Sequence, residues 1–463
     1  MQIQNIQSLM NFALTDSGNA ERLENALAER FAYVEELKKW LQFTGKRWQE
    51  ITPERVMDAA CEVFRMIRNG IYDLPQTTDK AERQQREAVL SWLEKSENAN
   101  KLKNAVTLLK GKLLVPYSQF DNDSNLLNLQ NGTLNLTTFE LFPHRAQDKM
   151  TKICGAEYHE HANGKWFDVI REILPDDDVR AYVKRFLGYC LTASTQEEKL
   201  LIACGPGGHG KGTLFETVAA VLGEYKDTIP VDVLLSSGQY GNGQGPTPEL
   251  AKLPGKRLVL SSESGKGRKL DEAKLKLLTG GDVLSARRLQ AEPFQFRPAF
   301  KLVIETNFLP VLADSTDKGI TRRLVTIPFN SEKITTVNTK LKSELLQPEN
   351  LSQCLEWLLQ GLGEWRRQGL GEIPAAAAEM ATKYYTSCDL VALWLEENTE
   401  ESGGFLQVTK AYNDFSEWLG AGKKWQRITF TEAMEQHGHV KQRFNGGIGF
   451  KGIALKNVFN DYM

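Results

Sequence analysis

The chain has 463 residues, about three times the usual domain size of roughly 150 residues, so we expect two to four domains. Hydrophobic residues at 41% and charged residues at 25% are ordinary for globular proteins and exclude collagen-like and low-complexity chains. Lysine and arginine number 57 against 59 acidic residues, and the net charge of −2 excludes a uniformly basic nucleic-acid binder.

The amino-terminal part of the chain is predicted to combine helices with short strands. Over residues 20–110 apolar side chains recur at helical spacing, as Val56 and Val63 illustrate, while Lys and Glu cover the other faces. Over residues 113–158 the apolar runs are short and alternate, with turn signals such as Asn131-Gly132. This pattern predicts small strands and hairpins after a mostly helical beginning.

A strand, a glycine-rich loop and a helix are predicted in the middle of the chain. Helical periodicity over residues 166–191, with Asp176 as a cap, leads into the apolar run 199–204. The loop comes next, and the helical run 214–222 follows it. The loop residues are Gly205, Pro206, Gly207, Gly208, His209, Gly210, Lys211, Gly212 and Thr213.

This loop matches Gly-x-x-x-x-Gly-Lys, the pattern of a phosphate-binding loop. Glycines let backbone N–H groups turn towards phosphate oxygens, the helix amino terminus adds partial positive charge, and Lys211 would reach the outer phosphates. The pattern expects Ser or Thr directly after the lysine to bind Mg²⁺, but here Gly212 precedes Thr213. We therefore predict an ATP site in which Thr213 is the loop's candidate metal ligand.

Three further apolar runs predict the rest of a parallel sheet. They cover residues 257–262, 300–306 and 323–329. Helical or hairpin segments separate them, so an α/β domain is expected. Beyond this domain the pattern is helical over residues 341–367 and 375–386.

Polar residues at the ends of two of these runs suit an ATPase. A carboxylate is needed there to order the attacking water and the metal shell, and Glu263 would serve both tasks because no second acid follows it. Asn307 ends the next run and suits a side chain that senses the γ-phosphate, with Thr306 as a weaker candidate. A solvated glutamate and a turn-forming asparagine are the alternatives.

A basic segment lies inside the near-neutral chain. Residues 251–323 carry 15 basic and 8 acidic side chains. Such an excess of positive charge is expected at a surface that binds the phosphate groups of nucleic acids. Arg322 and Arg323 at its end form a candidate arginine finger, which would reach the γ-phosphate of a neighbouring subunit and therefore requires a ring. A surface or DNA-facing basic pair is the alternative.

Together these motifs resemble the superfamily 3 helicases of the AAA+ class, in the phage and plasmid primase-helicase branch related to poxvirus primase-helicases. The resemblance covers most of the chain. Its amino-terminal motifs are residues 14–22, 45–48, 126–135 and 186–189. Its most specific part is the succession Gly255-Lys-Arg-Leu-Val-Leu-Ser-Ser-Glu263, Leu270-Asp-Glu-Ala-Lys274, Leu278-Thr-Gly-Gly-Asp282, Ala286-Arg-Arg-Leu289, Phe294-Gln-Phe-Arg-Pro298 and Asn307.

The resemblance implies a homo-oligomeric ring, a hexamer in the family, that uses ATP and Mg²⁺, with Thr213 and Glu263 as metal residues. It also implies that a helix and a hairpin between Glu263 and Asn307 move along single-stranded DNA in a channel. The matching basic residues are Lys274, Lys276, Arg287 and Arg288. Implied partners are single-stranded and forked DNA and a separate primase or host replication protein.

The chain departs from the family pattern at three positions near the ATP site. His209 stands where the family usually has asparagine, Gly212 where it often has serine, and Gly265 where a second acidic residue is common. These departures concern catalytic efficiency and leave the fold prediction intact.

A small terminal module is predicted after a linker at Gly403-Gly404. Helical runs over residues 408–419 and 429–437 precede a glycine-turned basic hairpin over 440–455, which predicts a winged helix. The candidates for contact with DNA phosphates are Lys441, Arg443 and Lys451. Protein docking is the alternative role of such a module.

The six cysteines stand singly, which excludes zinc ribbons, redox motifs and a disulfide framework and fits reduced thiols. Cys154, His159 and His161 resemble metal ligands superficially, but with no fourth ligand nearby we interpret them as part of a polar loop. The chain shows neither a signal-peptide pattern nor an apolar run of about 18 residues, so we expect a cytoplasmic protein of a bacterial host without membrane contact.

We therefore predict an α/β AAA+ P-loop ATPase domain with a parallel sheet, between a mixed α+β helicase-associated domain and a helical segment with a winged-helix module. The predicted segments are 1–110 (mostly helical), 111–194 (helicase-associated and helical collar), 195–335 (ATPase), 336–400 (helical lid or linker) and 401–463 (winged-helix-like). The functional hypothesis is a ring-forming, ATP-dependent DNA helicase for replication of a phage, satellite or plasmid. One alternative is a non-motor AAA+ initiator or loader with weak ATPase. A second alternative is a small-molecule kinase, but a kinase would leave the basic segment 251–323 unexplained.

Overall fold

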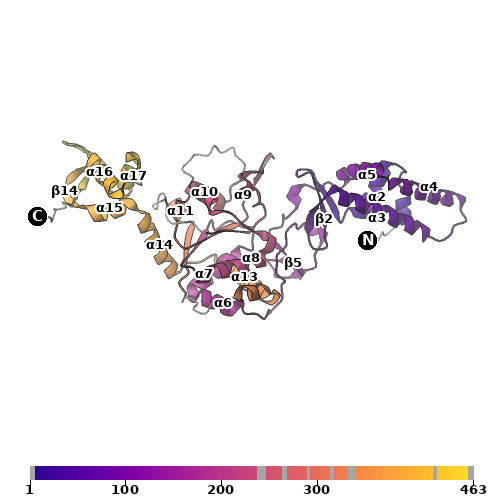
Figure 1. Ribbon diagram of the computed structural model, residues 1–463, viewed down its shortest axis with the longest axis horizontal. Helices are drawn as coiled ribbons and strands as arrows, with labels where there is room; N and C mark the ends of the chain where they lie inside the picture. Colours follow the sequence, from indigo (N-terminus) through magenta and orange to yellow (C-terminus); the bar gives the residue numbers. More distant parts are fainter. Residues whose placement is uncertain are drawn as a thin grey trace. The chain divides into compact units, whose positions relative to one another are not determined.

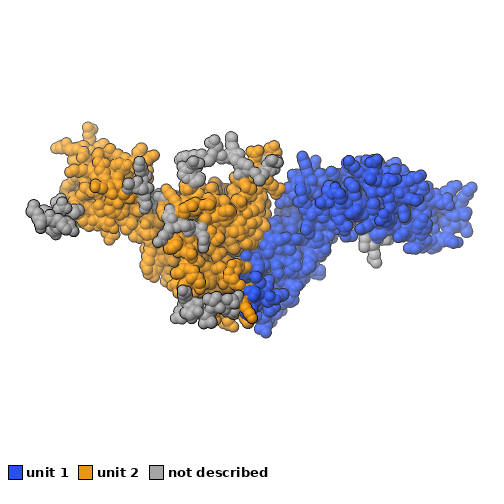
Figure 2. All heavy atoms as spheres, viewed as in Figure 1, with its two compact units in different colours: residues 1–164, 217–225, 343–356 blue, residues 165–216, 226–342, 357–463 orange. Residues whose placement is uncertain are grey.

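The computed structural model describes residues 6–236, 247–262, 268–288, 292–312, 317–331, 340–420 and 425–456. The chain divides into two compact units, which Figure 2 colours separately. Unit 1 comprises residues 1–164, 217–225 and 343–356, and unit 2 comprises residues 165–216, 226–342 and 357–463. Of the helices in these described ranges, none is both long and apolar enough to cross a membrane.

Unit 1 begins with helices that share one apolar core. In α3 (Pro53–Tyr72) the predicted helical spacing places Val56, Val63 and Ile67 on one buried face. These side chains belong to a single cluster with buried residues of the neighbouring helices. Those helices are α1 (Ile6–Met10), α2 (Asp16–Leu27), α4 (Lys80–Ser96) and α5 (Ala99–Lys112) (Figure 1).

A three-stranded antiparallel sheet interrupts the segment predicted to be mostly helical. Its strands are β1 (Phe31–Val34), β2 (Lys39–Phe43) and β3 (Trp48–Ile51). The prediction of a mostly helical segment is confirmed by α2, α3, α4 and α5, but it did not include these strands, which are stabilised by distant packing. Ala32, Leu41 and Trp48 form a small core with Phe120, and packing of this kind overrides local periodicity.

The predicted hairpins after the helical segment are confirmed. They are formed by β4 (Leu126–Leu129), β5 (Gly132–Asn135) and β6 (Leu141–Phe142), which pair as an antiparallel sheet. A Cβ atom on Gly132 would lie 2.5 Å from the carbonyl oxygen of Phe142, so the close approach of β5 and β6 requires glycine. Short 3₁₀ turns of this unit are η1 (Tyr117–Gln119), η2 (Ala146–Asp148) and η3 (Gly223–Tyr225).

A five-stranded parallel sheet forms the centre of unit 2, as predicted. Its order is β13-β7-β12-β9-β8, and every neighbouring pair is parallel. The strands are β7 (Leu200–Cys204), β8 (Lys226–Thr228), β9 (Leu258–Ser262), β12 (Lys301–Thr306) and β13 (Leu324–Pro328). The sequence predicted all of them except β8, which has three residues and carries no apolar run.

Different helices cover the two faces of this sheet. On one face, Leu302 and Ile304 of β12 share a core with Leu275 and Leu278 of α10 (Glu272–Thr279). Figure 1 shows α9 and α10 on one side of the sheet, and α6 and α7 on the other with the start of α8. The helices are α6 (Trp166–Ile173), α7 (Asp177–Tyr189), α8 (Lys211–Leu222), α9 (Pro248–Ala251), α10 (Glu272–Thr279) and α11 (Lys318–Thr321), with the turn η4 (Val231–Leu234).

Two smaller features of unit 2 follow the prediction. Asp176 caps α7, since its side chain accepts hydrogen bonds from the backbone N–H groups of Asp178 and Val179. The hairpin β10 (Leu284–Arg287) and β11 (Pro293–Phe296) pairs in antiparallel register between α10 and β12. After β13 come the helices α12 (Leu341–Leu345), α13 (Pro348–Gln368) and α14 (Ala375–Cys388).

The terminal module has its own core, in which Trp394, Phe415 and Phe430 pack together. Its elements are α15 (Leu390–Asn398), β14 (Thr399–Gln407), α16 (Val408–Leu419), α17 (Arg427–Gln436), β15 (Lys441–Phe444) and β16 (Gly447–Leu455). The strands form an antiparallel sheet in the order β14-β16-β15.

The linker predicted at Gly403-Gly404 is wrong. Both glycines lie inside β14, where the register against β16 shifts between Glu401 and Phe405. Glycine within a strand marks such an irregularity as readily as it marks a linker. The module also draws on α15, since Val391 and Trp394 belong to its core.

Candidate functional site

The glycine-rich loop joins β7 to α8 at the carboxyl edge of the sheet, as the sequence predicts. Gly205 lies so close to the chain after β13 that an added Cβ would stand 2.1 Å from the carbonyl oxygen of Phe329. Gly210 has a φ of +81°, and its Cβ would stand 2.6 Å from Ile173 in α6. Gly208 has a φ of +88°. The loop therefore depends on glycine for both packing and backbone conformation.

Open space lies over the middle of this loop. A Cβ added at Gly207 or Gly208 would meet no heavy atom of the described residues within 4 Å. His209 holds one side of the loop, because its Nδ1 lies 2.7 Å from the carbonyl oxygen of Ser331 beyond β13. Pro206 is exposed. A glycine cradle open to solvent before a helix amino terminus has the form that binds phosphate groups.

Lys211 and Asn307, which the sequence predicted in one site, lie together. The Lys211 ammonium donates hydrogen bonds to the carbonyl oxygens of Gly205 and of Pro206, the latter at 2.9 Å. It also donates to Asn307 Oδ1 at 3.2 Å. Asn307 directly follows β12, the strand beside β7, so the parallel order of the sheet brings the two side chains to one edge.

Gly212 and Thr213 occupy the first turn of α8. Beside the missing side chain of Gly212 lie Glu216 and Lys342, whose ion pair measures 2.7 Å. Both charged side chains are more than half exposed, at 57% and 56%. Thr213 is half-buried and carries the hydroxyl group in this turn that could hold a metal ion.

The predicted catalytic Glu263 lies outside the described residues, and so does Gly265. The described part of β9 ends at Ser262. Beside it, on β12, stands a carboxylate that the sequence analysis missed, Glu305. The signal was present, because Glu305 is an acidic residue within the apolar run that ends at Asn307.

Glu305 is half-buried on the face of β12 that α8 covers. Burial and the nearby charge of Glu216 raise the pKa of Glu305 to about 6, although Lys211, Lys342 and Lys226 act in the opposite direction. Of the charges that act on this carboxyl group, two belong to Lys211 and Glu216 of α8. Carboxylates with shifted pKa values in such a setting are candidates for functional residues.

Arg322 and Arg323 lie at the opposite edge of the sheet from the glycine loop. They precede β13 at the amino ends of the strands, whereas the loop follows the carboxyl end of β7. With five residues in β7, the two edges are about 15 Å apart. The Glu198 carboxylate forms ion pairs with both guanidinium groups, at 2.6 Å from Arg322 and 2.9 Å from Arg323. The pair therefore does not join the site of Lys211 in its own chain.

The predicted DNA-binding lysines of α10 are both ion-paired. Lys274 lies 3.5 Å from Asp271, the residue that caps α10. Lys276 donates to Asp317, which in turn caps α11, the short helix that leads to Arg322. Helix α10 is thus connected by a side-chain contact to the segment that carries the arginine pair.

The arginines of the hairpin are exposed at its described end. Arg287 is the last residue of β10, and Arg288 follows it. The guanidinium carbon of Arg288 lies 5.4 Å from the ring centre of Phe294, which is close enough for a cation–π interaction. An arginine beside an aromatic ring, with a second arginine next to it in the chain, can bind a nucleic-acid strand through phosphates and bases.

The three basic candidates of the terminal module do not share one face of its sheet. In the register of β15 and β16, Lys441 lies opposite Phe450 and Arg443 lies opposite Ile448. These two cations are two residues apart on one strand and therefore lie on the same face. Lys451 alternates to the other face, where it pairs with Phe405. Lys441 also forms an ion pair of 3.1 Å with Glu435 of α17.

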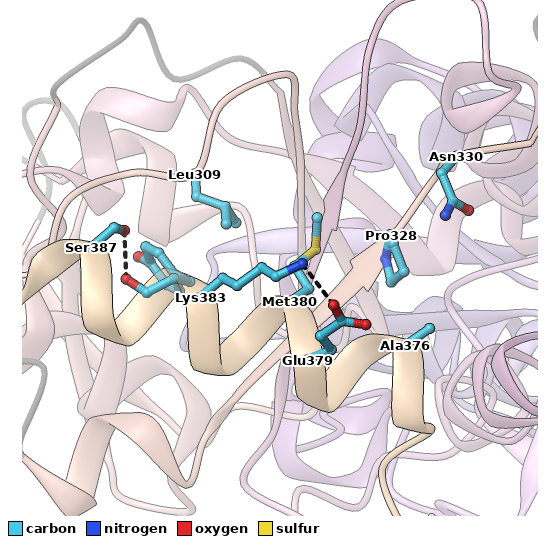
Figure 3. A pocket seen from close by; sticks show the side chains of 9 residues that line it. Leu309, Pro328, Asn330, Ala376, Glu379, Met380, Lys383 and Ser387 are labelled. Carbon is cyan, nitrogen blue, oxygen red and sulfur yellow. Dashed lines mark hydrogen bonds and ion pairs between the residues drawn. The ribbon is translucent and has the colours of Figure 1, made fainter.

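A pocket of about 580 Å³ lies beside α14 (Figure 3). Leu309, Pro328 and Met380 give it an apolar lining, and Glu379 and Lys383 form an ion pair of 2.6 Å along its side. The lining includes no residue of the glycine loop. The pocket is therefore separate from the site of Lys211.

Within the ranges that the structure describes, no group of three or more His, Cys, Asp or Glu residues could hold a metal ion. In the segment of Cys154, His159 and His161, the His159 Nε2 atom lies 3.0 Å from Glu157, and Cys154 is fully buried.

Two protein families match parts of the chain. A family described as "D5 N terminal like" matches residues 20–177, and a family of unknown function, DUF5906, matches residues 203–323. The second match includes the glycine loop, β9, α10, the hairpin and Asn307. The first covers most of unit 1.

Several viral proteins are similar in sequence. A protein of Acanthamoeba polyphaga mimivirus named "Putative helicase" is 28% identical over 71% of this chain and 36% of its own length. One of Invertebrate iridescent virus 3 with the same name is 24% identical over 69% of this chain and 38% of its own length. A "Putative primase" of African swine fever virus is 25% identical over 44% and 22%. The chain thus matches between 22% and 38% of the length of each of these relatives.

Solved structures of the C-terminal region of NrS-1 have a similar fold. One apo form aligns with a TM-score of 0.52 at 11% identity and covers 96% of this chain and 100% of that chain. Another aligns with a TM-score of 0.51 over 94% and 98%. At this identity the likeness concerns the fold alone, and it extends over both compact units.

Proposed function

Since the chain belongs to the phage and viral primase-helicase family, we propose that it is an ATP-dependent, ring-forming DNA helicase. It would unwind DNA for the replication of a phage, satellite or plasmid. The observation that carries this proposal is the hydrogen bond between Lys211 and Asn307 at the carboxyl edge of the parallel sheet. It joins a loop suited to phosphates to a neutral side chain suited to the γ-phosphate and the attacking water.

The loop residues fit ATP and Mg²⁺. The open space over Gly207 and Gly208 leaves room for phosphate groups. Lys211 would exchange its hydrogen bonds to loop carbonyl oxygens for bonds to the outer phosphates. We assign metal binding to Thr213 and Glu263, and the ion, when bound, neutralises charge that develops on the phosphates.

The arginine pair supports a ring as the active form. Because Arg322 and Arg323 lie at the far edge of the sheet from Lys211, they can reach a γ-phosphate only across a subunit interface. An arginine supplied in this way contributes about 10³- to 10⁵-fold to phosphoryl transfer in well-studied cases. We propose a homo-oligomer, a hexamer by family resemblance, with ATP between subunits.

DNA contact is proposed for α10 and the β10–β11 hairpin. The exposed Arg287 and Arg288, the second of which lies beside Phe294, suit single-stranded or forked DNA, because its bases stack on aromatic rings and its phosphates attract cations. The order helix, strand, two helices and two strands in the terminal module supports a winged helix. We propose that this module contacts DNA, a separate primase or a host replication protein.

The first test is steady-state ATP hydrolysis with and without single-stranded DNA. Strong stimulation by DNA is expected, because the hairpin and the ATP site lie in one domain. Lys211→Ala should abolish hydrolysis. The matched control is Lys256→Ala, which removes a lysine of the same unit that lies outside the loop. Hydrolysis that survives Lys211→Ala would contradict the site. Unwinding of a forked duplex then tests the motor.

A loader or initiator with weak ATPase is the second candidate, and Gly212 is the observation that favours it. The first turn of α8 lacks the hydroxyl group that phosphate loops usually offer directly after the lysine. Such a protein would hydrolyse ATP at a rate indifferent to DNA and would leave a forked duplex intact. The motor predicts the opposite result in both assays.

A further inference from the structure

An ion pair joins the helix before the β10–β11 hairpin to the segment that carries the arginine pair. The Lys276 ammonium of α10 donates to the carboxylate of Asp317, the residue before α11. The two side chains are 35% and 29% exposed, so the ion pair is partly shielded from solvent. The two helices also share a core, because Leu275 of α10 and Ile320 of α11 are fully buried in one apolar cluster. Charge and packing together therefore hold α11 against α10.

Asp317 also fixes the start of α11. Its Oδ1 atom accepts a hydrogen bond of 2.6 Å from the backbone N–H of Gly319, while its Oδ2 atom accepts from Lys276. Its carbonyl oxygen accepts a third bond, of 3.0 Å, from the hydroxyl group of Thr321. A Cβ atom added at Gly319 would stand 3.2 Å from Lys276 Nζ, so the lysine lies directly against the backbone of α11. One carboxylate thus caps the helix and holds the lysine at the same time.

The more exposed arginine stands at the other end of this short helix. Arg322 is the C-cap of α11, and its side chain is 58% exposed. Arg323 is only 11% exposed, and it donates to the carbonyl oxygen of Gly319 at 2.6 Å and pairs with Glu198. A helix of four residues is about 6 Å long. Because one turn of helix moves as a single piece, a shift at Asp317 is passed on to Arg322.

We propose that Lys276 is a positioning residue, which holds Asp317 and thereby sets the orientation in which Arg322 is presented to a neighbouring subunit. This inference rests on the ATPase activity and the ring proposed above. It gives Lys276 a role other than direct contact with DNA, because its ammonium is already bound to a carboxylate and lies against α11. Since α10 leads into the hairpin that begins at Leu284, DNA that displaces the hairpin would act on hydrolysis through this contact.

The experiment separates positioning from DNA binding by the steady-state kinetics of the full chain. Lys276→Met keeps most of the length of the side chain and removes its charge. The kcat for ATP hydrolysis at saturating single-stranded DNA should fall about tenfold or more, because a small misplacement of a group that acts in the transition state is costly. The KM for ATP and the affinity for single-stranded DNA should stay at their wild-type values. A loss of DNA affinity with an unchanged kcat would assign Lys276 to the DNA and overturn the proposal.

The matched control removes another helical lysine of the same unit that is bound to a carboxylate. Lys383 of α14 forms an ion pair of 2.6 Å with Glu379, and both side chains are exposed. Lys383→Met should keep the wild-type kcat. A loss as large as that of Lys276→Met would mean that any such change lowers hydrolysis, and it would overturn the proposal.

Variants of the carboxylate isolate the ion pair from the cap. Asp317→Asn keeps a side chain that caps a helix and removes the charge that holds Lys276. It should lower kcat as much as Lys276→Met does, and the double variant should lose no more than either single variant, because both changes break one contact. Lys276→Arg keeps the charge and should retain most of the kcat. Losses that multiply in the double variant would mean that the two side chains act independently, against the proposal.

Mixed rings test whether the contact acts across the subunit interface. When Lys276→Met subunits are combined with Lys211→Ala subunits, some interfaces join an intact Lys211 to an arginine that an intact Lys276 holds. Hydrolysis should therefore exceed that of Lys276→Met alone. No gain on mixing would mean that Lys276 acts on the ATP of its own chain, and the proposal would be wrong.

The unmodified chain separates this inference from the proposed function. If it hydrolyses ATP and loses hydrolysis when both arginines are replaced, while Lys276→Met keeps the wild-type kcat, the inference fails and the proposed function stands. If the unmodified chain hydrolyses no ATP in the presence of DNA, the proposed function fails and the inference fails with it.

Discussion

The two edges of the parallel sheet hold their candidate functional side chains by different means. At the carboxyl edge the backbone holds them in place. Gly205 and Gly210 have no room for a Cβ atom, and the loop that they form places Lys211 within hydrogen-bonding distance of Asn307. At the amino edge, ion pairs to Glu198 hold the arginine pair. Backbone geometry is fixed before a ligand arrives, whereas ion pairs can be exchanged. This difference is what we expect if, as proposed, one edge binds the chain's own ATP and the other reaches the ATP of a neighbouring subunit.

The largest expected effect tests this division between the edges. Replacing Arg322 and Arg323 by alanine should lower ATP hydrolysis by about 10³-fold. The negative charge on the phosphate groups in the transition state would no longer be stabilised by an arginine of the neighbouring subunit. Binding of ATP should stay unchanged, since neither arginine lies near Lys211 of its own chain. Hydrolysis and equilibrium binding of a fluorescent ATP analogue are measured on the same preparation.

Mixing subunits provides the control for the arginine variant. Combining it with Lys211→Ala subunits should restore part of the hydrolysis, because some interfaces then hold an intact lysine and an intact arginine pair. Arg171→Ala removes an exposed arginine paired to Asp168 and should change nothing. A mixture without activity would mean that the arginines do not act across an interface.

The next effect tests the backbone-fixed edge. Gly210→Ala should lower the free energy of unfolding by about 2 kcal/mol, because its φ of +81° and its contact with Ile173 both oppose a side chain. Gly207→Ala, three residues earlier in the same loop, has open space and should cost less than about 0.5 kcal/mol. Urea unfolding compares the two, and equal losses would mean that the loop does not depend on these contacts.

Most of the sheet could be predicted from the sequence because its strands are apolar runs with clear ends. Lys211 and Asn307 were paired correctly because both follow strands, and parallel strands bring their carboxyl ends to one edge. The strands β1, β2 and β3 could not be predicted in this way, because their packing depends on Phe120, which lies far along the chain. The glycines of β14 were misinterpreted because a bulge and a linker use the same residue.

Glu305 shows where sequence reasoning stops in the candidate site. Its position as neighbour of Ser262 depends on the strand order β7-β12-β9, and strand order follows from tertiary packing rather than from local pattern. The contact of Glu198 with the arginine pair was hidden for the same reason, because the residues are more than a hundred positions apart. Charge partners between strands need the register, which the sequence alone does not supply.

A smaller effect is expected when the ion pairs of the amino edge are weakened. Glu198→Gln should lower the free energy of unfolding by about 1 kcal/mol or less, because Arg322 is 58% exposed and only Arg323 is shielded from solvent. The matched change Glu216→Gln at the carboxyl edge breaks a pair whose members are both exposed and should cost close to nothing. A loss of several kcal/mol at Glu198 would show that ion pairs fix this edge as firmly as glycines fix the other.

The smallest effect extends the comparison to a titratable pair in the terminal module. The Nε2 atom of His437 at the end of α17 lies 3.1 Å from Asp389, which caps α15. This hydrogen bond raises the pKa of His437 above its usual 6.5, whereas burial and the charge of His437 lower that of His439. Because the folded-state pKa of His437 is raised, its contribution to stability is complete below pH 6.5 and is lost as the pH rises through the raised value.

The measurement is the difference in unfolding free energy between the wild-type chain and His437→Gln across that pH range. We expect a difference of about 0.5–1 kcal/mol on the acidic side that shrinks towards zero on the alkaline side. Asp389→Asn removes the partner but keeps a side chain that can cap α15, so it should abolish the pH dependence in the same way. A difference that grows with pH would mean that the neutral imidazole, not the ion pair, joins the two helices.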